Sequence, residues 1–345
     1  MQQNSNQRIV YLDLLRILAT FAVICQHVCV TEGFYIFSFS RNWFITAIGD
    51  SFTRWCVPVF VMISGSMFLN PSRNISYSEI LKVRIPRLLI AYVFWTVLYV
   101  FYGYSMTSFE NFSIHHLVIG LLSSHFHLWF LPMLMGVNLL IPMLRKIAMD
   151  KRLMQYSLVI WIAFVCFSFL RFVTLFKTAG HFHSLFTMNI VLGFSGYFLL
   201  GYYLSQQSFS KRQKSFVCLL GVVGAIITIS GTFYMSIKKG EGNERYFDSL
   251  SFQVAAMSIA LFVLMKEVAP KCGKVVLGFV KWVRKDLFGI YLVHVLWLDI
   301  VNSAALKHCY SNIITIPLIT LVVFIFSLFT TKLIRVIPYF KKVVE

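Results

Sequence analysis

Long apolar stretches alternate with short polar connections along nearly the whole chain. A helix that crosses the hydrocarbon core of a bilayer needs about 20 predominantly apolar residues. Ten stretches meet this requirement, at 9–30, 48–69, 87–105, 127–144, 153–172, 186–204, 215–235, 249–266, 287–306 and 311–337. The pattern therefore predicts an all-α fold, a polytopic membrane protein with about ten transmembrane helices.

Two of these stretches are less apolar than a helix that faces lipid. The stretch 48–69 contains Asp50 and Arg54, and the stretch 287–306 contains His294 and Asp299. Ionisable side chains at membrane depth usually face a protein interior or a water-filled cavity. We therefore expect both stretches to border a cavity.

The connections between these stretches are short, and we find no internal repeat. The first stretch contains Asp13 and Arg16 and has no small-residue cleavage site after it, so we do not interpret it as a removable signal peptide. We expect one membrane domain over residues 1–345.

Composition supports the membrane class. Hydrophobic residues make up 58% of the chain and charged residues only 13%, whereas soluble domains have about 25% charged residues. The seven cysteines are an odd number without the spacing of a disulfide framework, and we interpret Cys25, Cys56, Cys166 and Cys218 as buried thiols. Because His27 points away from Cys25 and Cys29 on a helix, we predict no metal site there.

The formal charge of +18 would suggest a nucleic-acid partner in a soluble protein, but here the basic residues indicate membrane sidedness instead. With the N-terminus inside, the inner connections hold 22 Lys and Arg residues and the outer connections hold 7. The remaining two are Arg16 and Arg54, inside predicted helices. This asymmetry predicts that both termini are cytoplasmic, and it gives no reason to expect nucleic acid.

Arg16 and His27 are the first candidate site residues. They are eleven residues apart, which on a helix is about three full turns and a rise of about 16 Å, so both side chains point the same way. We expect them to line one wall of a passage, with Arg16 in the inner half and His27 in the outer half. The alternative is that Arg16 only pairs with Asp13 and that His27 lies at the membrane interface.

The stretch 48–69 contains Pro58, followed by Ser64 and Gly65. Proline inside a helix removes a backbone hydrogen bond and kinks the helix. The Ser-Gly pair permits close backbone approach. Taken alone, these residues indicate only a packing device.

A basic cluster precedes the third predicted crossing, formed by Lys82, Arg84 and Arg87 around Pro86. Guanidinium groups match phosphate oxygens well. The simpler interpretation is a group of inner-side charges that contacts lipid head groups.

Two further histidine-containing segments stand out. His127 and Trp129 lie at the outer end of the fourth crossing, where composition alone favours an interfacial aromatic belt. Asp286 can cap the ninth helix, which then carries Tyr291 and places His294 about 12 Å from its start. An imidazole at that depth indicates either a polar cavity or a role in proton transfer.

These segments, taken in order, resemble the acyltransferase-3 family of integral membrane acyltransferases. The resemblance covers nearly the whole chain and depends on five motifs: the Arg-x10-His spacing of Arg16 and His27, the run from Pro58 to Gly65, Arg84-x-x-Arg87, the run from His127 to Leu131, and the run from Gly289 to His294. One departure is Asp286, where the family often has Ser. The lack of an appended hydrolase-like domain makes the chain most similar to the compact surface-polysaccharide O-acetyltransferases, including those that act on enterobacterial common antigen.

The resemblance implies transfer of an acetyl group from acetyl-CoA to a hydroxyl of a cell-surface or lipid-linked saccharide, at the inner (cytoplasmic) membrane. It implies that His27 and Arg16 are the essential pair and that Arg84 and Arg87 lie at the donor entrance, with Lys82 and Ser64 nearby. We expect five further residues to lie on the acceptor side or to support the site: His127, Trp129, Tyr291, His294 and Asp13. Imidazole suits the role of general base independently, because its pKa is close to neutral pH. A covalent acetyl-imidazole on His27 is a second route.

Two other functions are compatible with these residues if the family resemblance is set aside. A transporter or flippase for a lipid-linked or polymeric saccharide would also have many crossings, intramembrane charge and broken helices. A membrane scaffold for polysaccharide assembly would use Arg16 and His27 only for stability.

Overall fold

A computed structural model describes residues 4–106, 113–123, 125–167, 190–303 and 311–344. Within these ranges the regular structure is helical, as expected. The longer helices are α1 (Asn4–Cys29), α2 (Arg41–Thr53), α3 (Cys56–Phe68), α5 (Ile85–Met106), α6 (Ile114–Ser123), α7 (Phe130–Met149), α8 (Lys151–Phe167), α10 (Ile190–Gln206), α11 (Lys211–Lys239), α12 (Phe252–Val268), α13 (Lys274–Val283), α14 (Leu287–Ser303) and α15 (Asn312–Val336). Shorter turns are η1 (Val30–Phe34), α4 (Tyr77–Glu79), η2 (Ile80–Arg84), η6 (Ala269–Lys271) and η8 (Phe340–Val343).

Helices lie at each of the ten predicted positions, but fewer of them are long enough to cross a membrane alone. Six stretches of the described chain meet both the length and the apolarity that a crossing needs: Val10–Phe34, Tyr77–Ser105, Phe130–Met149, Lys211–Lys239, Phe252–Lys271 and Asn312–Val336. The helix over Leu287–Asn302 is apolar but shorter. The structure therefore supports a multi-pass membrane protein, while the count of ten and the cytoplasmic termini stay predictions. Residues 168–172, 186–189 and 304–306 of the predicted stretches lie outside the described residues.

The predicted second crossing is wrong as a single helix. It is divided into α2 and α3, each of 13 residues, or about 20 Å, which is too short for a hydrocarbon core of about 30 Å. The break at Arg54 and Trp55 has a local cause, because Pro58 has no N–H to donate to the carbonyl of Arg54, four residues earlier. Pro58 consequently lies in the first turn of α3 instead of kinking a continuous helix.

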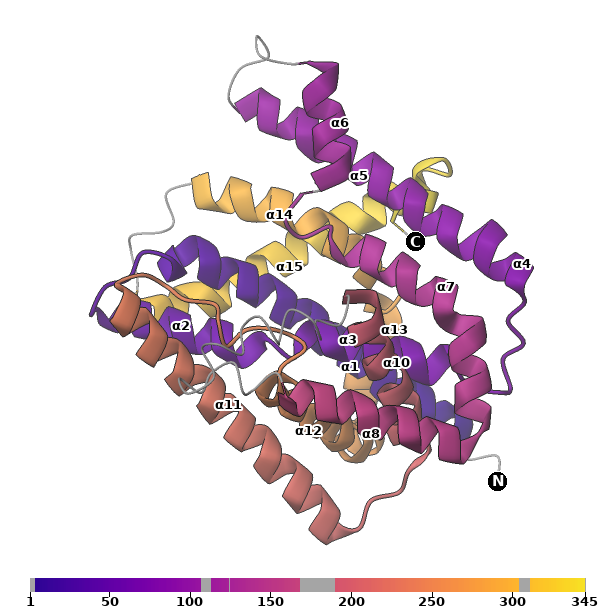
Figure 1. Ribbon diagram of the computed structural model, residues 1–345. Coiled ribbons are helices and arrows are strands. Elements are labelled where there is room, and N and C mark those ends of the chain that lie inside the picture. The colour runs from indigo at the N-terminus through magenta and orange to yellow at the C-terminus, as the bar shows by residue number, and fades with distance from the viewer. Residues whose placement is uncertain (1–3, 107–112, 124, 168–189, 304–310, 345) are drawn as a thin grey trace.

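Helix α1 lies inside the bundle and contacts α2, α3, α12, α14 and α15. Figure 1 shows α5, with α6 at its end, on one side of the molecule and α11 on the opposite side. Helices α3 and α10 cross closely because each has a glycine where they meet. A Cβ on Gly65 would overlap the backbone of Phe198, and a Cβ on Gly201 would overlap the backbone of Met62. The close approach expected at Gly65 is thus present, and it holds α3 in place beside α1.

The predicted burial of Cys166 is wrong. Cys56 is buried and Cys25 and Cys218 are partly buried, but Cys166 on α8 is exposed. An apolar run around a cysteine cannot distinguish a side chain that faces the bundle from one that faces outward, where a membrane helix meets lipid.

Candidate active site

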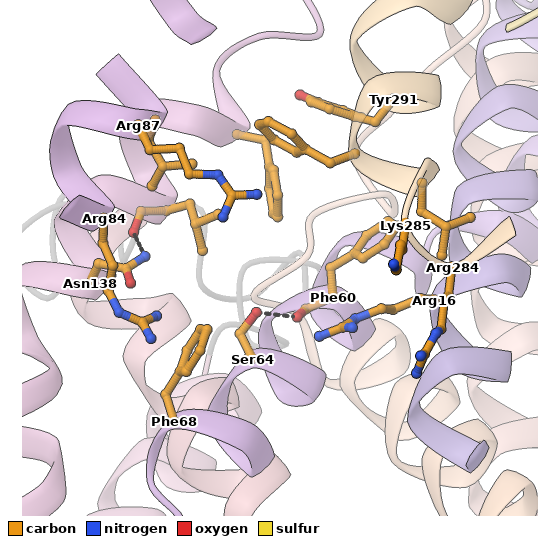
Figure 2. Close-up of a pocket in the computed structure, with 15 residues that line it drawn as sticks. Arg16, Phe60, Ser64, Phe68, Arg84, Arg87, Asn138, Arg284, Lys285 and Tyr291 are labelled. Carbon is orange, nitrogen blue, oxygen red and sulfur yellow. Dashed lines mark hydrogen bonds between the residues drawn. The ribbon is translucent and has the colours of Figure 1, made fainter. Parts of the chain in front are cut away.

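A cavity of about 490 Å³ opens among α1, α3, α5, α7 and α14, and we call it the basic cavity. Its cationic lining residues are Arg16, Arg84, Arg87, Arg284 and Lys285, and the rest of its lining contains no acidic side chain among the described residues. Figure 2 shows Arg84 and Arg87 on one side, with Arg16, Arg284 and Lys285 on the opposite side. Cations from three distant parts of the chain thus face one space.

Two carboxylates that pair with lining arginines compensate part of the positive charge of the basic cavity. Asp13 is buried and shared, because its Oδ1 lies 3.5 Å from Arg16 Nη1 and its Oδ2 lies 3.5 Å from Arg284 Nη1. Glu79 Oε1 lies 2.7 Å from Arg84 Nη2. Subtracting these two carboxylates from the five cations leaves a formal charge of +3 facing the cavity. Such a charge suits an anionic ligand.

The arginines of this cavity are held by more than ion pairs. Arg16 Nη2 lies 2.6 Å from the sulfur of Met67, and the Arg84 guanidinium lies 4.0 Å from the ring centroid of Phe68. Both supporting residues are on α3, which therefore positions one arginine from each side of the cavity. The predicted pairing of Arg16 with Asp13 is present, and Arg16 also lines the cavity, so pairing is not the whole of its placement.

The other predicted donor-side residues differ in placement. Ser64 lines the basic cavity and donates a hydrogen bond to the Phe60 carbonyl at 3.0 Å, as Figure 2 shows. Lys82 is exposed and is not among the lining residues. It lies on η2, where Arg84 takes the position that faces inward. The structure therefore groups Arg84 and Arg87 with the cavity and leaves Lys82 outside it.

A second cavity, of about 230 Å³, lies further along α1, and we call it the imidazole cavity. His27, His127, Trp129 and Tyr291 line it, so the structure brings these four predicted residues together. Its other lining residues are Val23, Gln26, Arg54, Val57, Phe60, Phe130, Phe247 and Ser249. A single space thus joins two imidazoles, a guanidinium and several aromatic rings.

Four histidines gather at this cavity. The ring of His27 stacks on the ring of His294 with 5.3 Å between centroids, and His127 meets His294 edge-on at the same separation. Nδ1 of His125 lies 2.9 Å from Nδ1 of His127. His294 is fully buried, and its Nδ1 lies 2.6 Å from the Tyr291 carbonyl. His294 is not among the lining residues of this cavity. It therefore reaches the site through its ring contacts with His27 and His127.

Tyr291 connects this cluster to α14. Its hydroxyl donates a hydrogen bond to the backbone carbonyl of His127. That bond joins the segment before α7 to α14, and it fixes the position of His127 relative to His294.

The continuous passage expected between Arg16 and His27 is divided in two. Phe60, Phe130 and Tyr291 line both cavities. The ring of Phe130 contacts the other two, with centroid separations of 6.0 Å to Phe60 and 5.8 Å to Tyr291. Both side chains of α1 face the protein interior, but a partition of three aromatic rings separates the spaces that they line.

Several residues of the two cavities were not among the predicted site residues. Arg284 and Lys285 counted only as inner-side charges, and Arg54 only as an intramembrane charge. Asn138 lines the basic cavity from α7 and donates to the carbonyl of Leu134 at 2.7 Å. A polar residue within an otherwise apolar crossing was the available signal for Asn138. No comparable signal distinguished Arg284 and Lys285 from the other cations of the inner connections.

Comparison with known protein families finds a match over most of the chain. The family model of the acyltransferase-3 group, described as an acyltransferase domain, matches residues 9–332. The chain belongs to the acyltransferase-3 family. Neither a comparison with curated proteins nor one with solved structures finds a match. Membership in the acyltransferase-3 family supports a membrane acyltransferase activity, and the two cavities are where we look for its chemistry.

Proposed function

We propose that this acyltransferase-3 protein transfers an acetyl group from acetyl-CoA to a hydroxyl of a cell-surface or lipid-linked saccharide. One observation carries the proposal: a cavity lined by five cations adjoins a cavity lined by histidines, and α1 contributes Arg16 to the first and His27 to the second. The compact type that modifies surface polysaccharides, such as enterobacterial common antigen, is the form of the family that we propose for this chain.

The basic cavity is the proposed donor site. CoA carries several phosphates, and guanidinium groups bind phosphate oxygens in a bidentate manner. Arg84 and Arg87 on one side, with Arg284 and Lys285 on the other, would hold the phosphates. Arg16 lies on the wall that continues toward the imidazole cavity. Because CoA is cytoplasmic, this proposal puts the basic cavity on the cytoplasmic side of the inner membrane, consistent with the 22 to 7 distribution of basic residues.

The imidazole cavity is the proposed site of reaction. In the direct route, His27 accepts the proton of the acceptor hydroxyl while the hydroxyl oxygen attacks the thioester carbonyl carbon. The C–O bond forms, the C–S bond breaks, and the imidazolium returns its proton to the leaving thiolate. In the second route, a ring nitrogen of His27 attacks the thioester carbon and the C–S bond breaks to release the CoA thiolate. The hydroxyl oxygen then attacks the acetyl carbon, the C–N bond to the imidazole breaks, and the hydroxyl proton passes to the thiolate. Either route requires the thioester to pass the rings of Phe60, Phe130 and Tyr291.

The acceptor side of this cavity is formed by Trp129, Gln26 and Ser249. The amide and the hydroxyl can hydrogen-bond to sugar hydroxyls, and the indole offers an amphipathic surface. His294 supports His27 by direct ring stacking, and His127 contacts His294 in turn.

The direct test is acetyl transfer in membranes supplied with labelled acetyl-CoA and the surface glycan acceptor. We expect wild-type protein to label the glycan and His27→Ala to lose the label, because the substitution removes the proposed general base or nucleophile from the wall that α1 contributes. His115→Ala is the matched control, since His115 is exposed on α6 and lines neither cavity. Full transfer by the His27→Ala protein would remove the catalytic assignment. Movement of a saccharide across liposomes without any acyl donor would favour a transporter instead.

A further inference from the structure

Arg54 is a charged residue that lines the imidazole cavity and has no role in the reaction described so far. It follows the last residue of α2, at the break that Pro58 imposes, and its side chain is only 11% exposed. A guanidinium keeps its charge under all ordinary conditions, so its removal from water carries a large desolvation penalty. The same cavity wall contains His27.

The surroundings of Arg54 hold its guanidinium in one place. Asp50, one helical turn earlier and fully buried, has its Oδ1 2.5 Å from Arg54 Nη2. Phe247 lies against the guanidinium, with 3.7 Å between Cζ and the ring centroid. Glu244 Oε1 is 3.7 Å from Nη2, and the hydroxyl of Tyr35 donates to that same oxygen at 2.6 Å. Burial and this hydrogen bond raise the pKa of Tyr35, so the phenol keeps the proton that it donates.

These contacts do not satisfy every N–H donor of Arg54. Among the described residues, Nε and Nη2 of Arg54 are buried and make no hydrogen bond. Both carboxylate oxygens of Asp50 are also buried without a hydrogen bond, although Oδ1 lies at ion-pair distance from Nη2. A buried ion pair without satisfied hydrogen bonds contributes little to stability, because apolar residues of similar volume often stabilise a protein equally well. An unsatisfied guanidinium that borders a cavity instead suits a ligand oxygen with negative charge.

The reaction proposed above produces such an oxygen in this cavity. When a hydroxyl or an imidazole attacks a thioester, the carbonyl π electrons move to the oxygen, and a tetrahedral intermediate with an oxyanion forms. We propose that Arg54 is a further catalytic residue, whose N–H groups donate to this oxyanion while Asp50 and Phe247 hold the guanidinium in position. The inference depends on the proposed acyl transfer, and it assigns a chemical role that His27 cannot perform while it carries the proton or the acyl group.

When the intermediate collapses, the electron pair returns from the oxygen to re-form the carbonyl, the C–S bond breaks, and the thiolate takes a proton from the imidazolium. Arg54 gains and loses no proton in this sequence. Its effect is therefore expected on kcat and not on donor binding, because the charge that it stabilises exists only after attack.

The test compares kcat and the donor KM in variants chosen to keep the fold. Arg54→Lys keeps a positive charge beside Asp50 but lacks the planar fork, and we expect kcat to fall at least about tenfold. The double variant D50N/R54Q removes both charges and leaves no buried ion alone, and we expect kcat to fall by about 10²- to 10³-fold. In both, the donor KM and the melting temperature in detergent should stay near those of wild type. Arg41→Gln, an exposed arginine on the same helix, is the matched control and should not change kcat.

A second measurement separates chemistry from structure. Guanidinium ion added to Arg54→Ala should restore part of the lost rate, which a purely structural role would not allow. Wild-type kcat in the folded D50N/R54Q protein, or a donor KM that rises while kcat is unchanged, would overturn the role of Arg54 and leave the proposed function intact. Absence of acyl transfer by the wild-type protein would overturn the proposed function, and this inference with it.

Discussion

Replacing Arg284 with glutamine removes one positive charge from the basic cavity with little disturbance of the bundle. Arg284 and Arg16 share the single carboxylate of Asp13, each at 3.5 Å, so the three groups together carry a formal charge of +1. In Arg284→Gln the remaining Arg16–Asp13 pair is formally neutral. Because Arg284 also lines the cavity, the lost charge is one that a phosphate of the donor would meet.

The expected magnitude follows from the exposure of this side chain. A hydrogen bond to a charged group contributes about 1.5–3 kcal/mol. The Arg284 side chain is 41% exposed, so solvent screens it and the lower end of this range, about 1.5 kcal/mol, is appropriate. That free energy corresponds to about a tenfold increase in the KM for acetyl-CoA. We expect kcat to stay within about twofold, because Arg284 does not line the imidazole cavity where the reaction is proposed.

The assay is initial-rate acetyl transfer in membranes as labelled acetyl-CoA is varied at low salt. Lys281→Gln is the matched control, because Lys281 is an exposed cation on α13 that does not line the cavity. The reasoning predicts a higher donor KM for Arg284→Gln than for Lys281→Gln, and a wild-type donor KM that rises with salt. Equal donor KM values in wild type and Arg284→Gln would refute the assignment of the basic cavity to the donor.

Two further predictions concern the supports of the site. Gly201→Ala should lower the thermal stability in detergent by about 1–3 kcal/mol or more, because its Cβ would overlap the backbone of Met62. Gly103→Ala, in a helix with open space around it, should be neutral or stabilising, and equal melting temperatures would contradict the close crossing of α3 and α10. Tyr291→Phe leaves the carbonyl of His127 without its donor, which costs about 1–3 kcal/mol. We expect slower transfer with an unchanged donor KM, and a rise in the donor KM alone would show that Tyr291 serves only the basic cavity.

The all-helical membrane fold and the family could be predicted from the sequence, since apolar length and ordered motifs are local signals. The regular structure of the described residues is helical and the family match covers residues 9–332. The break between α2 and α3 was missed because Pro58 was expected to kink one continuous helix, whereas the bond that it fails to make with Arg54 ends α2. The count of ten crossings stays a prediction, because apolarity does not distinguish a short broken helix from one that crosses the membrane alone.

The candidate site was predictable in part. The spacing of Arg16 and His27 correctly places both side chains toward the protein interior, because helical periodicity fixes the face of a helix. The aromatic partition was not predictable. In a chain with 17% aromatic residues, nothing in the sequence indicates that Phe60, Phe130 and Tyr291 meet.

Arg284 and Lys285 were missed for a related reason. The basic residues of inner connections are expected from membrane topology alone. Which of them face a common cavity depends on tertiary packing between distant segments. The sequence placed Arg54 with Asp50 in a stretch expected to border a cavity, but the contact of Arg54 with Phe247 depends on tertiary packing.

The most direct measurement of the central claim is an experimental structure of the protein with acetyl-CoA bound. The account predicts phosphates among Arg84, Arg87 and Arg284, and a thioester that has passed the rings of Phe60 and Phe130 to lie within hydrogen-bonding reach of His27. A donor bound elsewhere, or one whose thioester stays in the basic cavity while the protein is competent for transfer, would contradict it.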